Sequence, residues 1–208
     1  MNIPVVYEDD WLLVVDKPAG LLTIPTPRNE KRTLTSILND DLKERGLLYR
    51  LHPCHRLDRE TSGLVIYAKG KSIQKKMMDE FKNKSVGKIY LAFVQGRVAK
   101  DQGEINRPIE FRPAITKYRV SQRRKDFTVL EVMLLTGRTN QIRIHLKVIG
   151  YPIVGETKYA FRKDFKLRAK RLCLHARDLE FLHPVTKKVM RLSAGLPEDL
   201  NKFLDNHN

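Results

Sequence analysis

Runs of β-forming residues with alternating hydrophobic and polar positions predict strands along most of the chain. Residues 3–8 and 11–16 form two such runs around an acidic turn, and Pro18 and Gly20 end the second. Comparable runs occur at residues 63–69, 86–98, 115–122, 126–135, 172–182 and 187–194. A basic turn separates the 115–122 run from the next one, which predicts an antiparallel hairpin.

Hydrophobic residues at helical spacing predict four helices between these strands. The predicted helices cover residues 33–45, residues from about 72, residues 139–149 and a short stretch from Pro197. Thr33 could cap the first helix, and Thr139 or Asn140 the third. The apolar stripes expected in the core are Leu34, Ile37, Leu38 and Leu42, then Ile73, Met77 and Phe81, and finally Ile142, Leu146 and Ile149.

The order of these elements predicts an α+β fold. Many neighbouring strands are joined by short turns, so we expect a largely antiparallel or mixed central sheet flanked by helices and loops. A chain of 208 residues with 41% hydrophobic content can build a proper core. No repeat, linker or low-complexity segment interrupts it, and we therefore expect one domain over residues 1–208.

The charge balance indicates a polyanionic partner. The chain has 40 Lys and Arg against 24 Asp and Glu, a formal net charge of +16. Nucleic acid is favoured over an anionic membrane, because no run approaches ~18 apolar residues. No lipidation signal stands at either end. The first ten residues lack the basic start and apolar stretch of a signal peptide, so we expect a cytoplasmic protein.

Cysteine and histidine point to neither a disulfide framework nor a metal site. Cys54 and Cys173 are the two cysteines of the chain, and we expect both to be structural thiols. His52, Cys54 and His55 lie close together in sequence, but structural zinc needs four ligands and no second pair accompanies them. We expect neither a metal nor a cofactor.

The segment HRLDRETSGL, residues 55–64, could carry chemistry. It places Asp58 between Arg56 and Arg59, just before a predicted strand. An ionised carboxylate beside guanidinium groups can act as a nucleophile. Neighbouring charges of opposite sign are also typical of a solvated surface salt bridge. The residue pattern alone leaves both interpretations open.

HRLDRETSGL resembles the signature of the RluA class of pseudouridine synthases, in which the aspartate is the catalytic residue. Four further segments resemble the same family in the expected order. They are LLVVDKPAGL at 12–21, KIYLAFVQG at 88–96, GRTNQIRIHL at 137–146 and LCLHARDLEFLHP at 172–184. The resemblance covers nearly the whole chain and implies an RNA uridine isomerase with the fold of that family.

The resemblance implies a cofactor-free reaction in which uracil is detached from its ribose at N1, rotated and rejoined through C5. Asp58 would start it, either by attacking the sugar or by helping to form a glycal. Arg143 matches the basic residue that pairs with this aspartate, and Tyr90 matches the tyrosine that lies against the target uracil. Arg56 matches an arginine that fills the space left in the RNA when the target base is extruded.

Further residues are expected to contact RNA. In the motifs they are His55, Arg56, Arg59, Thr61, Lys88, Arg138 and Gln141. Residues 158–171 interleave basic and aromatic side chains, as an RNA-facing arm would, although a solvated helix pinned by its aromatic residues would look the same. The arm residues expected to contact the RNA backbone are Arg162, Lys163, Lys166 and Lys170. The basic turn at 123–125 is a weaker candidate.

Two positions depart from the family pattern. Asn140 stands where the family usually has histidine, and Glu156 stands where aspartate is commoner. Asparagine can still form hydrogen bonds but cannot titrate near neutral pH. The chain also starts directly in the catalytic motifs, so we expect no N-terminal S4 RNA-binding domain.

The expected substrate is a structured stem-loop of ribosomal RNA, of tRNA or of both, handled by a monomer without an obligate protein partner. Two alternatives remain at this stage. A basic RNA-binding protein could keep the fold without the chemistry, although Asp58, Tyr90 and Arg143 are all present. A nuclease using His55 and Asp58 is poorly supported, because it would rest on a single carboxylate without a set of metal ligands.

Overall fold

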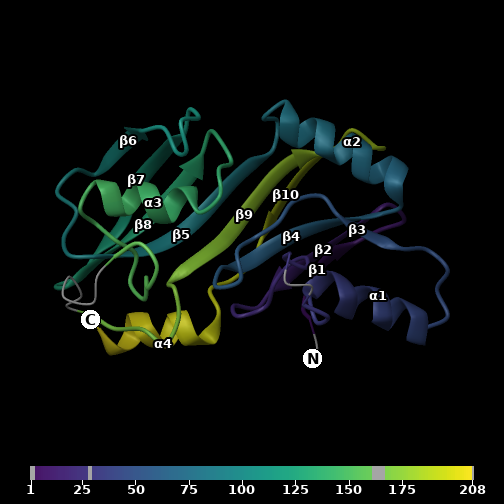
Figure 1. Cartoon of the computed structure of the whole chain (residues 1–208), viewed down its shortest axis with the longest axis horizontal. Helices are drawn as coiled ribbons and strands as arrows, with labels where there is room; N and C mark the ends of the chain where they lie inside the picture. The colour runs from purple at the N-terminus through teal and green to yellow at the C-terminus, as the bar shows by residue number, and fades with distance from the viewer. Residues whose placement is uncertain (1–2, 28–29, 161–166, 208) are drawn as a thin grey trace. The chain divides into compact units, whose positions relative to one another are not determined.

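Groups of two or four strands are separated by single helices in a computed structural model that describes residues 3–27, 30–160 and 167–207 (Figure 1). The strands are β1 (Val5–Glu8), β2 (Leu12–Lys17), β3 (Leu51–Pro53), β4 (Ser62–Lys69), β5 (Gly87–Gln95), β6 (Gln102–Asn106), β7 (Ile115–Arg123), β8 (Phe127–Leu134), β9 (Leu174–Leu182) and β10 (Val189–Ser193). The helices are α1 (Leu34–Glu44), α2 (Lys71–Lys82), α3 (Gln141–Val148) and α4 (Glu198–Asn206). The fold is α+β, as predicted.

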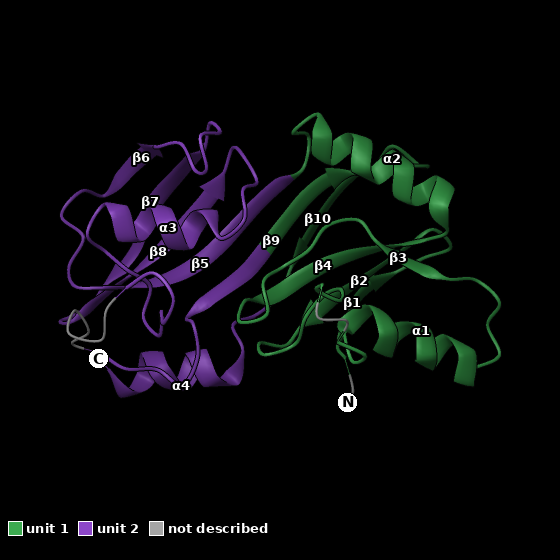
Figure 2. Cartoon of the chain, in the orientation of Figure 1, with its two compact units in different colours: residues 1–86, 178–194 green, residues 87–177, 195–208 purple. Residues whose placement is uncertain are grey.

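The chain divides into two compact units, each made of two separate stretches (Figure 2). Unit 1 contains residues 1–86 and 178–194, and unit 2 contains residues 87–177 and 195–208. Strand β9 passes through the boundary, so its first residues belong to unit 2 and its last residues to unit 1. The hydrophobic pattern of the sequence does not mark this division.

Unit 1 is a set of antiparallel strands with helices against them. Strand β2 pairs with β1 and β4, β3 also pairs with β4, and β10 pairs with β9. Residues 12 and 14 of β2 and residues 64 and 66 of β4 share one face, and they form a core cluster with Ile73 and Met77 of α2. The next residue along β4, Tyr67, points to the opposite face, where its hydroxyl lies 3.0 Å from Thr35 Oγ1 of α1.

Unit 2 is built on four antiparallel strands in the order β5–β8–β7–β6. Tyr90 of β5 and Tyr118 of β7 are both paired with Val132 of β8, so the three side chains form a row on one face. Helix α3 lies on this face, because Gln141 Nε2 donates to Thr116 Oγ1 at 3.0 Å, two residues from Tyr118. The opposite face is closed by an aromatic cluster of Phe93, Phe127 and, from α4, Phe203.

The helix predictions hold well, apart from one cap. Thr33 caps α1 as expected, in a capping box with Ser36. Asn140 occupies the N-cap position of α3, but its backbone is left-handed, with φ of 54°, and its side chain makes no capping bond. The prediction that a side chain caps α3 is therefore wrong for Asn140, whose amide is engaged elsewhere. The short strands β3 and β6 were not predicted.

Candidate active site

The segment that carries Asp58 is the loop between β3 and β4 of unit 1. Asp58 itself is half-buried, whereas Arg56 and Arg59 beside it are exposed. The backbone N–H of Thr61 donates to the Asp58 carbonyl at 3.1 Å, which closes a tight turn around the aspartate. The loop therefore presents one partly shielded carboxylate between two cations that are open to solvent.

The residue before Asp58 is held by a single hydroxyl group. Thr23 Oγ1 donates to the Leu57 carbonyl at 3.0 Å and accepts from the Leu57 N–H at 3.1 Å. Both residues are buried, with 1% of Thr23 and 4% of Leu57 exposed. The carbonyl of Thr23 in turn accepts from Thr35 Oγ1 at 2.7 Å, which ties this contact to the start of α1. Leu57 is fixed through both of its backbone polar groups.

The residue after Asp58 is held by a buried ammonium group. Lys17 is fully buried, and its Nζ donates to the carbonyls of Pro18, Leu21 and Arg59 at 2.9, 2.8 and 3.2 Å. The N–H of Gly20, at φ 83°, donates to the same Arg59 carbonyl at 2.8 Å. Burying a charge is costly unless hydrogen bonds satisfy it, and these carbonyls provide them. Asp58 thus lies between two anchored neighbours.

Two residues of this loop are less suited to RNA contact than the resemblance implied. His55 Nε2 accepts from the Ile66 N–H at 3.1 Å, and its ring lies 4.9 Å from that of Phe81. Thr61 is buried, with 2% of its surface exposed, in the turn that follows Asp58. Their positions suit them to supporting the loop rather than to contacting RNA.

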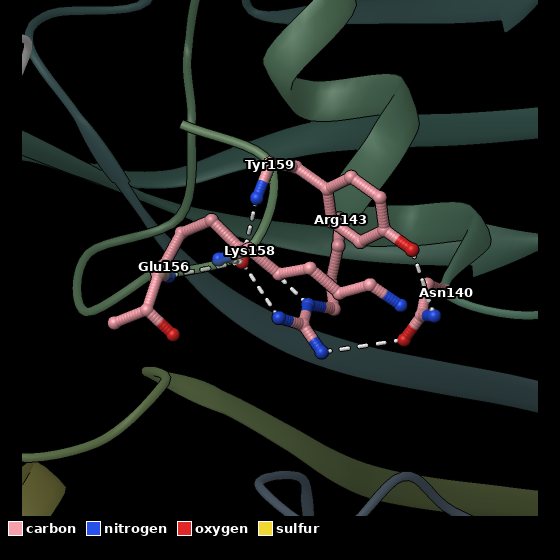
Figure 3. A network of polar contacts seen from close by, with 6 residues as sticks. Asn140, Arg143, Glu156, Lys158 and Tyr159 are labelled. Carbon is pink, nitrogen blue, oxygen red and sulfur yellow. Dashed lines mark hydrogen bonds and ion pairs between the residues drawn. The ribbon is translucent and has the colours of Figure 1, made fainter. Parts of the chain in front are cut away.

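Arg143 of α3 forms a buried, bidentate ion pair with Glu156 in unit 2 (Figure 3). Its Nε donates to Oε2 at 2.7 Å and its Nη2 to Oε1 at 2.6 Å. Burial alone would raise the pKa of Glu156, but the hydrogen bonds and charge of Arg143, with backbone donors, hold it below the ordinary carboxyl value. The carboxylate therefore stays ionised opposite the guanidinium.

The same network fixes the surroundings of this pair. Glu156 Oε1 also accepts backbone hydrogen bonds from Thr157, Lys158 and Tyr159, at 3.0, 2.8 and 3.3 Å. Asn140 Oδ1 accepts from Arg143 Nη1 at 3.2 Å, while Asn140 Nδ2 donates to the Tyr159 hydroxyl at 2.9 Å. The guanidinium carbon lies 5.3 Å from the centre of the Tyr159 ring. Asn140 thus uses its hydrogen-bonding capacity to link Arg143 with Tyr159.

Tyr90 lies on the sheet face covered by α3, the helix that carries Arg143. Its side chain is 6% exposed. Lys88, two residues earlier on β5, is half-buried, and burial lowers its pKa. A half-buried lysine is less accessible to a backbone phosphate than an exposed one, which reduces the case for Lys88 as an RNA contact.

The remaining predicted RNA contacts differ in exposure. Gln141 is 2% exposed, and its amide bonds to Thr136, Thr116 and the Ile115 carbonyl, so it is an interior residue rather than an RNA contact. Arg138 is half-buried and donates through Nε to the Pro113 carbonyl at 3.1 Å.

The basic arm lies partly within the described residues, and the basic turn lies wholly within them. Lys170 is exposed, whereas Arg162, Lys163 and Lys166 lie outside the described residues. In the turn at 123–125, Arg123 bonds to the carbonyls of Val98 and Ala99 and to Asp101. Arg123 is therefore engaged in holding its own unit together.

Histidine, cysteine and carboxylate side chains are the candidates for metal or thiol chemistry. Residues 3–27, 30–160 and 167–207 contain no group of three or more His, Cys, Asp and Glu side chains that could hold a metal ion. Burial raises the pKa of both Cys54 and Cys173 to about 12, which keeps them as thiols. None of the helices in the described part is long and apolar enough to span a membrane.

Sequence reasoning missed three residues that organise these sites: Lys17, Thr23 and Glu156. Lys17 lies in the matched segment 12–21 and Glu156 was noted only as a departure from the family pattern. Nothing local distinguishes Thr23 from other threonines. The expected pairing of Asp58 with Arg143 stays a prediction, because the two residues belong to different units.

Comparisons with known proteins agree on one family. A family model described as RNA pseudouridylate synthase matches residues 11–147. An uncharacterized RNA pseudouridine synthase, YlyB of Bacillus subtilis, is 35% identical over 99% of this chain and 73% of its own. The dual-specificity RNA pseudouridine synthase RluA of Pasteurella multocida is 33% identical over 92% of both chains. Ribosomal large subunit pseudouridine synthase D of Xanthomonas campestris is 36% identical over 96% of this chain and 68% of its own.

A solved structure agrees at the level of the fold. That of human RNA pseudouridylate synthase domain containing 4 covers 97% of this chain and 92% of its own, with a TM-score of 0.82 and 23% identity. The family match spans more than half of the chain and includes Asp58, Tyr90 and Arg143. This chain therefore belongs to the RNA pseudouridine synthase family and is an RNA uridine-to-pseudouridine isomerase.

Proposed function

We propose that Asp58 is the catalytic carboxylate of this isomerase. The observation that carries the proposal is the pair of anchors around it, with Leu57 held by Thr23 and the Arg59 carbonyl held by Lys17 and Gly20. A nucleophile or base must be placed within a fraction of an ångström of its target atom. Anchored peptide groups on both sides supply that precision to a residue in a loop.

Tyr90 and Arg143 have supporting roles in this proposal. The ring of Tyr90 lies against the target uracil, where a flat surface suits a base that must turn. Arg143 is the proposed basic partner of Asp58, as the resemblance to the family implies. The hydrogen bonds of Arg143 to Glu156 and Asn140 support this role, because a guanidinium that is already oriented loses little entropy when it pairs with a carboxylate.

The substrate class follows from the relatives and from the charge. Relatives are named as a ribosomal large subunit enzyme and as a dual-specificity RNA enzyme. We therefore propose a stem-loop of large-subunit ribosomal RNA as the substrate, with tRNA as a second one. The enzyme would act on it as a monomer in the cytoplasm, and its formal charge of +16 would supply affinity for the backbone.

The cations among the predicted RNA contacts divide into two classes. Arg56 is exposed two residues before Asp58, which suits a side chain that fills the gap left by the extruded uridine. Arg59 and Lys170 are exposed and suit contacts to phosphates. Arg138 is half-buried and donates to the Pro113 carbonyl, so it is a weaker candidate for a phosphate contact. The arm residues Arg162, Lys163 and Lys166 stay predictions.

Pseudouridine mapping tests the proposal directly. Cells that lack the gene are complemented with the native protein or with Asp58→Asn, and pseudouridine is mapped in their total RNA. The two RNA samples should differ in pseudouridine at one or a few positions. The amide is close in shape to the carboxylate but cannot act as an anion. We expect the modification to return with the native protein alone, at unchanged levels of folded protein. Modification restored by Asp58→Asn would remove Asp58 from the reaction.

A further inference from the structure

Phe111 stands at the tip of a two-residue hairpin turn with its whole side chain in solvent. Its exposed fraction is 104%, the highest among the large hydrophobic residues in the described ranges. The turn is closed by reciprocal hydrogen bonds between Ile109 and Arg112, at 2.9 and 3.0 Å. Glu110 and Phe111 are its two central residues, with φ of 50° and 60°.

This turn is unfavourable for the residues that form it. A tight hairpin with positive φ at both central positions is favoured by Asn and Gly, which tolerate the left-handed region. A bulky aromatic residue there is strained, and its exposure means that folding gains nothing from its apolar surface. Strain that packing does not offset is concentrated at functional sites. Because packing does not account for Phe111 at this position, we expect its ring to contact a binding partner.

The base of the hairpin is firmly attached to unit 2. Ile109 is buried, with 6% exposed. The carbonyl of Arg107 accepts from His145 Nε2 of α3 at 2.9 Å, and the Pro113 carbonyl accepts from Arg138 Nε at 3.1 Å. Arg138 precedes α3 in the segment that leads to Arg143. The tip is thus a fixed projection beside a helix that carries a proposed site residue.

The charge around the tip favours an anionic partner. Arg107 and Arg112 are exposed on either side of the turn, and the chain as a whole is strongly basic. Glu110 is paired with Arg112 at 3.3 Å. Cations beside an exposed aromatic ring are the arrangement that binds single-stranded nucleic acid, in which bases stack on rings and phosphates meet the cations.

We propose that Phe111 stacks on an unpaired base of the substrate RNA, outside the base that is modified. The inference rests on the proposed function only in taking RNA as the partner. Arg112 contacts a neighbouring phosphate. The hydrogen-bonded turn fixes the backbone before binding, so stacking orders only the side chain of Phe111.

The test separates stacking from strain. The probe is a ten-nucleotide oligouridylate with one central 2-aminopurine, whose fluorescence falls when it stacks. Phe111→Asn relieves the left-handed backbone, so its Tm should equal or exceed that of the native chain. Its RNA affinity should nevertheless fall about tenfold. Phe111→Tyr keeps a ring and should bind like the native protein.

Two further variants serve as controls. Leu48, exposed to 103% in unit 1, is an equally solvated apolar residue, and Leu48→Asn should leave the affinity unchanged. Arg112→Gln should reduce the slope of log affinity against log salt by about 1, whereas Phe111→Asn should leave that slope as it is. This contrast distinguishes a base contact from a phosphate contact.

Equal RNA affinity and equal quenching for Phe111→Asn and the native chain would overturn the proposal. Loss of self-association in that variant, with RNA binding intact, would assign the ring to a contact between copies and would overturn it too. Pseudouridine formation by the native protein is measured in parallel. If it is absent while Phe111-dependent binding persists, the proposed function fails and the stacking inference stands.

Discussion

Thr23 and Leu57 lie 34 residues apart in sequence, yet one hydroxyl satisfies both backbone groups of the leucine that precedes Asp58. Thr23→Val keeps the shape of the side chain and leaves a buried N–H and a buried carbonyl without this partner. We expect a loss of about 1–3 kcal/mol in the free energy of unfolding. We also expect a lower kcat with little change in KM, because Asp58 loses its placement. Thr23→Ser should restore both.

Thr128 provides the matched control for this prediction. It is fully buried in unit 2, and its hydroxyl also bridges two backbone groups, donating to Gly96 and accepting from Val98. Thr128→Val should therefore lose comparable stability while kcat is kept. Chemical denaturation and steady-state kinetics measure the two effects separately. Equal loss of kcat in both variants would show that Thr23 acts through general stability.

Glu156→Gln should weaken the fold in a pH-dependent way. Breaking a buried ion pair by removing one charge costs about 3–5 kcal/mol. Because the pKa of Glu156 lies below the ordinary value of 4.5, its stabilisation is complete above that pH and is lost as the pH falls toward the lowered pKa. The difference in free energy of unfolding between the native chain and Glu156→Gln should therefore narrow below pH 4.5.

Glu104 provides a comparison in the same unit. Its pair with Lys117 spans 3.7 Å and both side chains are about half exposed, so Glu104→Gln should change stability by less than about 1 kcal/mol. Urea unfolding from pH 7 to pH 3 measures both variants. A difference for Glu156→Gln that stays constant over this range would mean that lost packing, rather than lost charge, explains it.

Tyr90→Phe should bind RNA as well as the native chain but isomerise more slowly. The ring that lies against uracil is kept, while the hydroxyl that could assist proton removal from C5 is lost. We expect single-turnover rates to fall on the order of 10²-fold. Tyr118 lies in the same row of the sheet, across Val132, and Tyr118→Phe should keep the native rate. Unchanged rates in Tyr90→Phe would limit Tyr90 to stacking.

Arg56→Ala should slow base extrusion more than it weakens binding. Without a side chain to fill the gap, extrusion is less favourable by a few kcal/mol, about the cost of unstacking the base. Lys170→Gln instead removes one exposed cation, so binding should weaken and the salt slope should fall by about 1. Stopped-flow fluorescence of a base beside the target uridine reports extrusion. Identical behaviour of the two variants would make Arg56 another phosphate contact.

Local sequence signals predicted the parts of the fold that depend on nearby residues. Thr33 caps α1 through a residue three positions away, so its role is visible in the sequence. Strand β6 was missed because residues 102–106 are mostly polar and only Ile105 is buried. Strand β3 was missed because three residues that end in Pro53 give no alternation to detect.

The site was predictable where a motif carried it, and not where tertiary contacts did. Asp58, Tyr90 and Arg143 stand in matched motifs, whereas the hydrogen bonds of Lys17 and Thr23 become visible only once the chain is folded. Asn140 adopts a left-handed backbone, and its side chain bonds to Arg143 and Tyr159 instead of capping the helix. Tyr159 lies 19 residues away in sequence, so this partner is not visible from local spacing. Glu156 lies 13 residues beyond Arg143, past any helical spacing.

The passage of β9 through the boundary between the units has a consequence for synthesis on the ribosome. The first 86 residues of unit 1 emerge early, but the core cluster of that unit also includes Leu179, Phe181 and Ala194. These residues are translated only after most of unit 2, so the nascent unit 1 must wait with an incomplete core and exposed apolar surface. At the usual rate of roughly 5–20 residues per second, that interval lasts about 5–20 s. Premature termination before β9 should therefore yield a chaperone-dependent, aggregation-prone product rather than a folded half.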